Sequence, residues 1–212
     1  MNERNNFIPL KIILIGSINV GKTSLITKYS TGIYSTNTNT VNNPSYIVKI
    51  REVNGIKYEI KLWDTAVQEK YKSLSKLFFK NANIAILVYS IDNEESFNDL
   101  DEWLKLTRTV NNEDIILGVA ANKIDLALDN TISEEKGREY AKRIGGIFYT
   151  TSALLENKGL DNLIDDLLRK YNENNNDYEY SNILNVGMIQ SSYDSNTLKI
   201  DQSREAKKGC LK

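Results

Sequence analysis

The 212-residue chain contains no histidine and a single cysteine, Cys210. The lack of histidine excludes imidazole catalysis and histidine-ligated metal sites. One cysteine cannot form a disulfide within the chain, which suits a reducing compartment such as the cytosol. Any chemistry must therefore depend on carboxylates, amides, lysine, hydroxyl groups and a metal held by oxygen ligands.

The chain also lacks a large excess of charge of one sign and long hydrophobic runs. The 27 basic and 28 acidic residues leave a net charge of -1, which gives no electrostatic reason to expect a nucleic acid or an anionic membrane surface as partner. No apolar stretch approaches the roughly 18 residues of a membrane span, and residues 1–6 lack the apolar run of a secretory signal. We expect a cytoplasmic protein that does not bind nucleic acid.

Apolar runs of strand length alternate with helical patterns along the chain. Asn54-Gly55 lies between two such runs and is a strong hairpin signal. This alternation indicates an α/β fold with a mostly parallel sheet and helices on both faces, and ligands then bind beyond the carboxyl ends of the strands. The expected strands cover residues 10–15, 45–53, 56–63, 84–89, 115–120 and 147–150. The expected helices lie near 22–31, around a face with Phe97, Leu100, Trp103 and Leu104, from Ser133, and through Leu160 to Tyr171.

Residues 16–23 carry the pattern G-x-x-x-x-G-K-T directly after the first strand. In this pattern backbone N–H groups surround phosphate oxygens, the lysine reaches the terminal phosphates and the threonine hydroxyl binds Mg²⁺. The alternative is a plain glycine turn, but the strand, loop and helix patterns all agree with a phosphate-binding loop. The expected phosphate-binding residues are Gly16, Asn19, Val20, Gly21, Lys22, Thr23 and Ser24, with Thr23 as a metal ligand.

Three further polar segments follow expected strands. Asp64, in Trp63-Asp64-Thr65-Ala66, can hold Mg²⁺ through water. The segment Asn122-Lys123-Ile124-Asp125 ends in a carboxylate that can accept the ring N–H and the exocyclic amine of guanine, a donor pair that adenine lacks. Thr151-Ser152-Ala153 can offer a backbone N–H to the guanine oxygen.

Taken together and in this order, the four motifs resemble the Ras superfamily of small GTPases, with the greatest similarity to the Rab branch. The Rab-like features are Leu62 to Ala66, the paired aromatics in Leu77 to Ala82, Val88-Tyr89, Ser96-Phe97 and Trp103. The resemblance implies a small G domain over residues 9–171 with a P-loop NTPase fold and a six-stranded, mostly parallel sheet. It leaves an N-terminal extension (residues 1–8) and a flexible polar tail (residues 172–212).

The resemblance also implies roles for residues and partners. Tyr34 would stack on guanine, Gln68 would orient the attacking water, and Leu154 stands where relatives have a lysine that covers the base. The implied ligands are GTP, GDP and Mg²⁺, and the implied partners are effector, exchange and activating proteins. The function expected is a switch between GTP-bound and GDP-bound states in vesicle traffic. The protein would act as a monomer on the cytosolic face of endomembranes.

Three positions depart from the family pattern near the third phosphate. Ile18 replaces a small residue, Val41 stands where a threonine ligates Mg²⁺, and Val67 replaces the glycine of D-T-A-G-Q. Thr40 could serve as the ligand only if the loop slips by one residue. Because this catalysis depends on positioning, we expect slow or impaired GTP hydrolysis. Two alternatives stay open: loop shifts that restore a working switch, and a non-cycling guanine-nucleotide-binding scaffold. A nucleotide kinase is disfavoured because no second acceptor site is evident.

Two surface features complete the expectations. Tyr46, Trp63 and Phe78 fall where Rab proteins present three aromatics to effectors, although ordinary core packing explains them equally well. Cys210 is third from the end of the chain and so does not form a C-a-a-X box. By resemblance Cys210 is a prenylation site for membrane attachment, and the alternative is an unmodified thiol.

Overall fold

The computed structural model describes residues 7–33, 45–65, 78–111, 115–127, 131–156 and 158–175. The chain divides into two compact units, Met1–Lys170 and Tyr171–Lys212. Of the second unit, only residues 171–175 are described, and they are helical. The fold below is that of the first unit.

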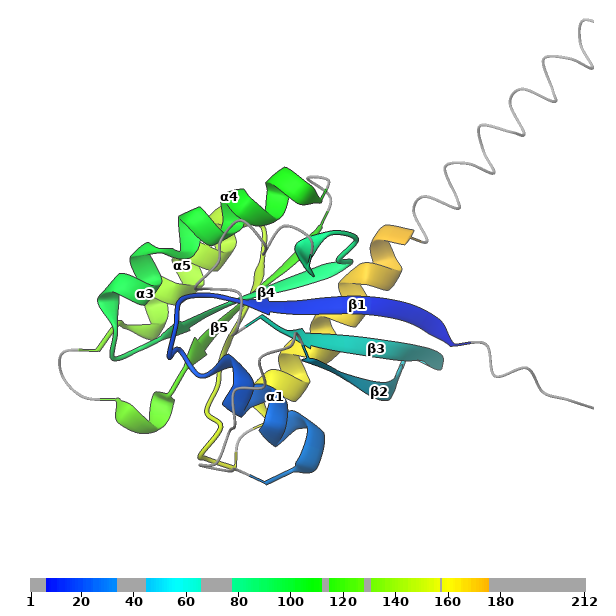
Figure 1. Ribbon diagram of the computed structural model, residues 1–212, viewed down its shortest axis with the longest axis horizontal. Helices are drawn as coiled ribbons and strands as arrows, with labels where there is room; N and C mark the ends of the chain where they lie inside the picture. The colour runs from blue at the N-terminus through cyan, green and yellow to red at the C-terminus, as the bar shows by residue number, and fades with distance from the viewer. Residues whose placement is uncertain are drawn as a thin grey trace, which may run out of the picture. The chain divides into compact units, whose positions relative to one another are not determined.

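A six-stranded sheet forms the centre of the first unit, with the strand order β2-β3-β1-β4-β5-β6. Only β2 and β3 pair antiparallel, and the other neighbouring pairs are parallel (Figure 1). The predicted six-stranded, mostly parallel sheet is therefore confirmed. The strands are β1 (Ile8–Ile15), β2 (Ser45–Val53), β3 (Ile56–Asp64), β4 (Ile84–Ser90), β5 (Ile116–Asn122) and β6 (Ile147–Thr150).

Local sequence explains the strands. Every residue of β4 and β5 is buried, as continuous apolar runs require when both faces of a sheet are covered. Asn54 and Gly55 have φ values of 54° and 78°, the left-handed conformations that a tight hairpin turn needs. The predicted hairpin between β2 and β3 is therefore confirmed.

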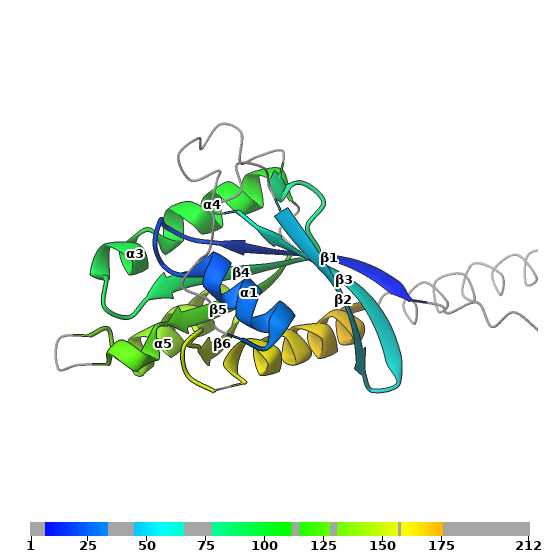
Figure 2. The ribbon, with the colours of Figure 1, turned by 60° about the horizontal axis from the view of Figure 1, so that its bottom comes forward.

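Helices cover both faces of the sheet. Figure 2 shows α3 and α4 on one side of the strands, with α1 and the helical residues 159–170 on the other. Within the described ranges, no helix combines the length and apolarity needed to cross a bilayer. The labelled helices are α1 (Lys22–Thr31), α3 (Glu94–Asn98), α4 (Leu100–Val110) and α5 (Glu134–Ile144), and a short 3-10 helix, η1, covers Ile124–Leu126.

The single helix expected around Phe97 to Leu104 is in fact two helices, α3 and α4, which meet at Asp99. The apolar spacing continues through the junction because Asp99 keeps helical torsions, with φ of -70° and ψ of -14°. Hydrophobic periodicity could not reveal this break. All four predicted core residues of this face are buried, namely Phe97, Leu100, Trp103 and Leu104.

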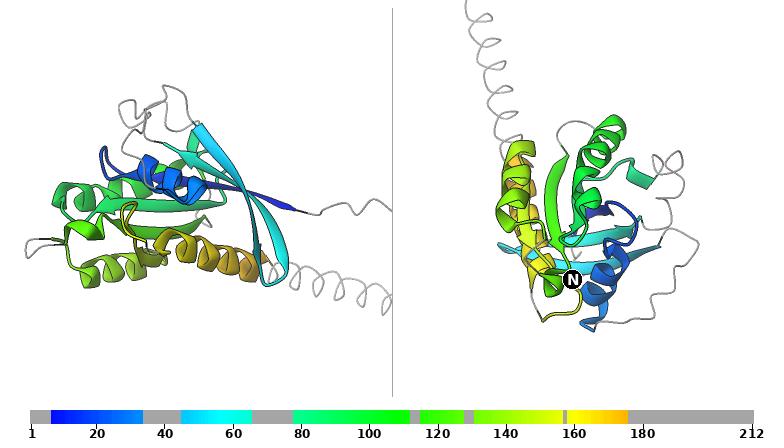
Figure 3. Two further views of the ribbon diagram at one scale, coloured as in Figure 1. Left: turned by 90° about the horizontal axis from the view of Figure 1, so that it is seen from below. Right: turned by 90° about the vertical axis from the view of Figure 1, so that its left-hand side faces the viewer.

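An ion-pair cluster connects the β2–β3 hairpin to the helix that begins at residue 159. Arg51 in β2 lies 2.7 Å from the Asp165 carboxylate and 3.1 Å from that of Asp161. Figure 3 shows this helix reaching the hairpin, which crosses it at a steep angle. The edge strand β2 is thereby tied to the helical layer and not only to β3.

The packing of α5 on the sheet predicts a size limit at Gly137. A Cβ atom added there would lie 2.3 Å from the Tyr89 hydroxyl and 2.5 Å from the Phe148 ring. We expect Gly137→Ala to lower the free energy of unfolding by about 1–3 kcal/mol, because overpacking outweighs the better helix propensity of alanine. Urea unfolding followed by tryptophan fluorescence measures this change. The exposed Glu139→Ala substitution in the same helix serves as the control, and equal stability of the two variants would contradict the packing argument.

Candidate nucleotide-binding site

The phosphate-binding loop connects the end of β1 to the start of α1. A Cβ atom on Gly16 would lie 2.0 Å from the Val88 carbonyl oxygen, and one on Gly21 would lie 2.5 Å from Asn122 Nδ2. Gly21 also has a φ of 95°, which side chains rarely adopt. The two glycines of the motif therefore allow the loop to pass close to the ends of β4 and β5.

Lys22 places its ammonium group inside this loop. The residue is only 2% exposed, and its Nζ donates hydrogen bonds to the carbonyl oxygens of Gly16 at 3.0 Å and Ser17 at 2.8 Å.

The other predicted loop residues differ in exposure. Asn19 is exposed with a φ of 63°, and Val20 is fully buried. Thr23 and Ser24 are half-buried in the first turn of α1, so the loop residues predicted from sequence lie together.

Asn122 joins the phosphate-binding loop to the segments predicted to bind the base. It ends β5 and is 1% exposed. Its Nδ2 donates to the Val20 carbonyl oxygen at 2.7 Å, and its Oδ1 accepts from the Thr151 hydroxyl at 3.1 Å. One buried amide thus connects three segments that are far apart in the sequence.

Asp125 and Ser152 face each other at the edge of the sheet. The Ser152 hydroxyl donates to Asp125 Oδ1 and accepts from the backbone N–H groups of Leu154 and Leu155, both at 3.0 Å. Ala153 is buried, whereas Leu154 is exposed. This arrangement holds the Asp125 carboxylate, an acceptor-only group, beside a turn that follows β6.

Lys123 lies between Asn122 and Asp125 in the sequence. Its backbone has the left-handed conformation, with a φ of 63°. Its Nζ is 4.0 Å from the Asp92 carboxylate, a partly exposed and therefore weak ion pair. Six of the residues predicted from the sequence to contact the base are described, and they end or follow β5 and β6 at the same edge of the sheet: Asn122, Lys123, Asp125, Ser152, Ala153 and Leu154.

Asp64 is a buried carboxylate at the carboxyl end of β3. In the parallel register it lies opposite Leu14, just before the phosphate-binding loop, and the hydroxyl of Thr65 donates to the Leu14 carbonyl oxygen at 2.6 Å. In the part of the chain that the structure describes, no three histidine, cysteine or acidic residues gather into a metal site. The two described residues predicted from the sequence to hold a cation are Thr23, in the first turn of α1, and Asp64, at the end of β3.

A hydrogen-bond network that connects Ser17 of the phosphate-binding loop to Asp99 and Trp103 could not be predicted from the sequence motifs. The Ser17 hydroxyl donates to Asp99 Oδ2 at 2.6 Å and accepts from Trp103 Nε1 at 3.2 Å. The hydroxyl at the second position of the motif was the only sequence signal for it. Asp99 gave none, because its partner lies 82 residues away.

Tyr46, Trp63 and Phe78 form a row of aromatic rings. The ring centroids of Tyr46 and Trp63 are 4.7 Å apart, and those of Trp63 and Phe78 are 6.5 Å apart. Tyr46 is 47% exposed, whereas Trp63 and Phe78 pack partly against the core. Lys11 Nζ lies 4.7 Å from the Trp63 ring centroid. The row thus has one end in the core and the other at the surface.

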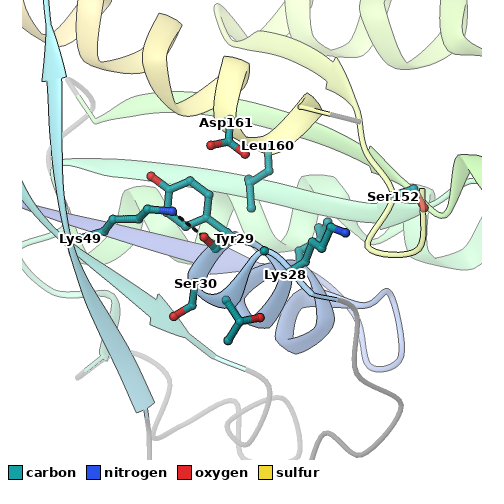
Figure 4. Close-up of a pocket in the computed structure, with 10 residues that line it drawn as sticks. Lys28, Tyr29, Ser30, Lys49, Ser152, Leu160 and Asp161 are labelled. Carbon is teal, nitrogen blue, oxygen red and sulfur yellow. Dashed lines mark hydrogen bonds between the residues drawn. The ribbon is translucent and has the colours of Figure 1, made fainter. Parts of the chain in front are cut away.

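A cavity of about 310 Å³ lies beside the segments predicted to bind the base, between the end of α1, β2 and the helix that begins at residue 159 (Figure 4). Lys49 Nζ donates to the Tyr29 carbonyl oxygen at 2.6 Å and lies 4.0 Å from the centroid of the Tyr29 ring. Burial raises the pKa of Tyr29 to about 12, so its hydroxyl stays protonated at neutral pH. Ser152 lines this cavity and also belongs to the segments predicted to bind the base.

Several predicted site residues lie outside the described residues. They are Tyr34, Thr40, Val41, Val67, Gln68 and Cys210. Ile18 is described, and its side chain is 51% exposed at the tip of the phosphate-binding loop.

Comparison with known proteins agrees with this geometry. The model of the Ras family matches residues 11–173. The chain is 33% identical to the Ras-related protein Rab-21 of Geodia cydonium over 173 residues, which cover 82% of this chain and 75% of that protein. It is 34% identical to human Ras-related protein Rab-21 (76% and 71% covered) and 33% identical to mouse Ras-related protein Rab-12 (76% and 68% covered). The chain therefore belongs to the Ras family and is a Rab-like small GTPase.

Proposed function

We propose that the protein binds GTP and GDP with Mg²⁺ and acts as a slowly hydrolysing switch in vesicular membrane traffic. The nucleotide-binding domain would cover residues 9–171, between an extension at residues 1–8 and a tail at residues 172–212. The observation that carries the proposal is the pairing of two preformed elements, the Lys22 ammonium inside the phosphate-binding loop and the Asp125 carboxylate beside Ser152. Asn122 bonds to the loop that holds Lys22 and to Thr151, so one rigid unit would read both ends of a nucleotide.

Two residues fit a magnesium ion at the phosphate end. The Thr23 hydroxyl is in the first turn of α1, and the Asp64 carboxylate is at the end of β3. Mg²⁺ prefers hard oxygen ligands and is commonly held by one or two protein groups, water and substrate phosphates. The bound ion would neutralise the phosphate charge, while Thr23 would act directly and Asp64 through water.

Base selectivity provides a direct test. The Asp125 carboxylate only accepts hydrogen bonds, whereas an asparagine amide accepts one and donates another. We expect Asp125→Asn to weaken GDP binding by about 10- to 100-fold, the usual effect of losing a charged hydrogen bond, and to improve binding of xanthosine diphosphate, which has a carbonyl in place of the guanine amine. Fluorescence titration of the purified chain with both nucleotides measures the two affinities.

The control for this experiment is Glu139→Gln, which removes an exposed carboxylate from α5. It should leave both affinities unchanged. An Asp125→Asn protein that still prefers GDP would show that Asp125 does not read the base.

Slow hydrolysis is proposed because of Ile18 and Val67, which replace small residues of the family pattern near the third phosphate. Ile18 is 51% exposed, so its side chain projects away from the core. A group displaced by about 1 Å can cost on the order of a hundredfold in rate. The second candidate function, a scaffold held in one nucleotide state, is favoured by the same residues together with Val41, which has no oxygen to replace a threonine ligand.

Single-turnover hydrolysis of GTP by the full chain with Mg²⁺ separates these functions. We expect slow turnover, with a rate about 10- to 100-fold higher for the double variant Ile18→Gly and Val67→Gly. The branched Ile18 side chain would crowd the third phosphate, and Val67 replaces a glycine whose N–H would turn onto that phosphate. Ile8→Gly, at the opposite end of β1, is the control and should not change the rate. No hydrolysis, with equal affinities for GDP and a non-hydrolysable GTP analogue, would exclude the switch and favour the scaffold.

The proposal includes several protein partners. Tyr46, Trp63 and Phe78 would receive effector proteins, because aromatic rings with one exposed end are common anchors of interfaces. Exchange and activating proteins would regulate a monomer on the cytosolic face of endomembranes.

Prenylation of Cys210 would supply the membrane anchor. Because one chain gives only marginal and reversible binding, we expect a substantial soluble pool beside the membrane-bound protein. Mass spectrometry of the protein from its native cell should detect the added lipid on Cys210. An unmodified C-terminal peptide in the membrane fraction would exclude this anchor.

A further inference from the structure

We propose that Asp99 and Trp103 are positioning residues for the phosphate-binding loop: they hold the hydroxyl of Ser17 and thereby fix the carbonyl groups that orient Lys22. This role rests on the proposed nucleotide binding, in which Lys22 contacts the terminal phosphates. It assigns the junction between α3 and α4 to the phosphate site.

The Ser17 hydroxyl makes two hydrogen bonds to residues at this junction, one as donor and one as acceptor. It donates to Asp99 Oδ2 at 2.6 Å and accepts from Trp103 Nε1 at 3.2 Å. A hydroxyl group can do both at once, and the bond to an ionised carboxylate is stronger than a neutral one. Two partners in different directions fix the Ser17 side chain much better than one could.

Both partners belong to a well-packed element. Trp103 is buried on α4, and its neighbours Leu100 and Leu104 are buried in the same hydrophobic cluster. Asp99 is fixed by its own backbone, because its N–H donates to the Glu95 carbonyl oxygen at 2.9 Å. Closely packed interiors transmit displacements, so the junction provides a firm support for Ser17.

Ser17 connects this support to Lys22. Its side chain contacts Asp99 and Trp103, whereas its carbonyl oxygen accepts from Lys22 Nζ at 2.8 Å. Because both groups belong to one residue, anchoring the side chain also restrains the backbone that carries the carbonyl. A lysine side chain has many rotamers, and holding it in place before the ligand arrives reduces the entropy lost on binding.

The test compares Ser17→Ala with the wild-type full chain in binding to GDP and to GMP. GMP lacks the terminal phosphates that the loop lysine reaches. We expect Ser17→Ala to weaken GDP binding roughly three- to tenfold, the usual effect of losing hydrogen bonds of this kind, with GMP binding unchanged. Titration with a fluorescent GDP analogue, and competition by GDP and GMP, give the affinities.

Trp103→Phe provides a second variant that keeps an aromatic ring at this buried position but removes the Nε1 donor. It should weaken GDP binding in the same selective way, and the double variant with Ser17→Ala should be no worse than Ser17→Ala alone, because both changes break one network. The control is Thr109→Ala, which removes an exposed hydroxyl of α4 that bonds to Lys105 and should change neither affinity.

Three outcomes would overturn this role. They are an unchanged GDP affinity in Ser17→Ala, an equal loss of GDP and GMP affinity, and effects of Ser17→Ala and Trp103→Phe that simply add. If Ser17→Ala fails to fold, the GDP-to-GMP affinity ratio of Trp103→Phe decides in the same way. A wild-type chain that binds no guanine nucleotide would instead contradict the proposed function.

Discussion

The buried amide of Asn122 is the interaction on which the organisation of the site depends. It ends β5, donates to the carbonyl oxygen of Val20 in the phosphate-binding loop and accepts from Thr151 after β6. A buried amide is costly unless its hydrogen bonds are made, so the geometry of all three segments is tightly coupled. The parallel sheet makes this contact possible, because it brings the carboxyl ends of β1, β5 and β6 to one edge.

Much of this edge could be predicted from the sequence because its signals are local. The apolar runs of β4 and β5, the Asn54-Gly55 turn and the glycine–lysine loop each carry their own physical cause within a few residues. The alternation of strands and helices indicates a parallel sheet. Each polar motif follows a strand and is therefore expected at the carboxyl ends of the strands, where ligands bind in such sheets. The sheet and the predicted residues there follow from these patterns.

Contacts between distant segments could not be predicted in the same way. The partner of Ser17 lies 82 residues away, and nothing in the local pattern of either residue indicates the other. The break between α3 and α4 could not be predicted for a related reason, since Asp99 preserves the apolar spacing and its side chain accepts from the distant Ser17 hydroxyl. The orientation of Asp125 by Ser152 likewise depends on how two loops meet, which propensity and periodicity do not determine.

The residues proposed to hold the nucleotide differ in burial from Ile18, which is proposed to slow hydrolysis. The residues that would hold the nucleotide are anchored by buried contacts: Lys22 to loop carbonyls, Asn122 to Val20 and Asp125 to Ser152. The departure from the family pattern at Ile18 is instead at the exposed tip of the loop, where its side chain makes little core contact. A change there can alter the space around the third phosphate without disturbing the buried network. A chain of this family can therefore lose efficient hydrolysis by substitutions at the loop tip and still keep the architecture that binds guanine nucleotides.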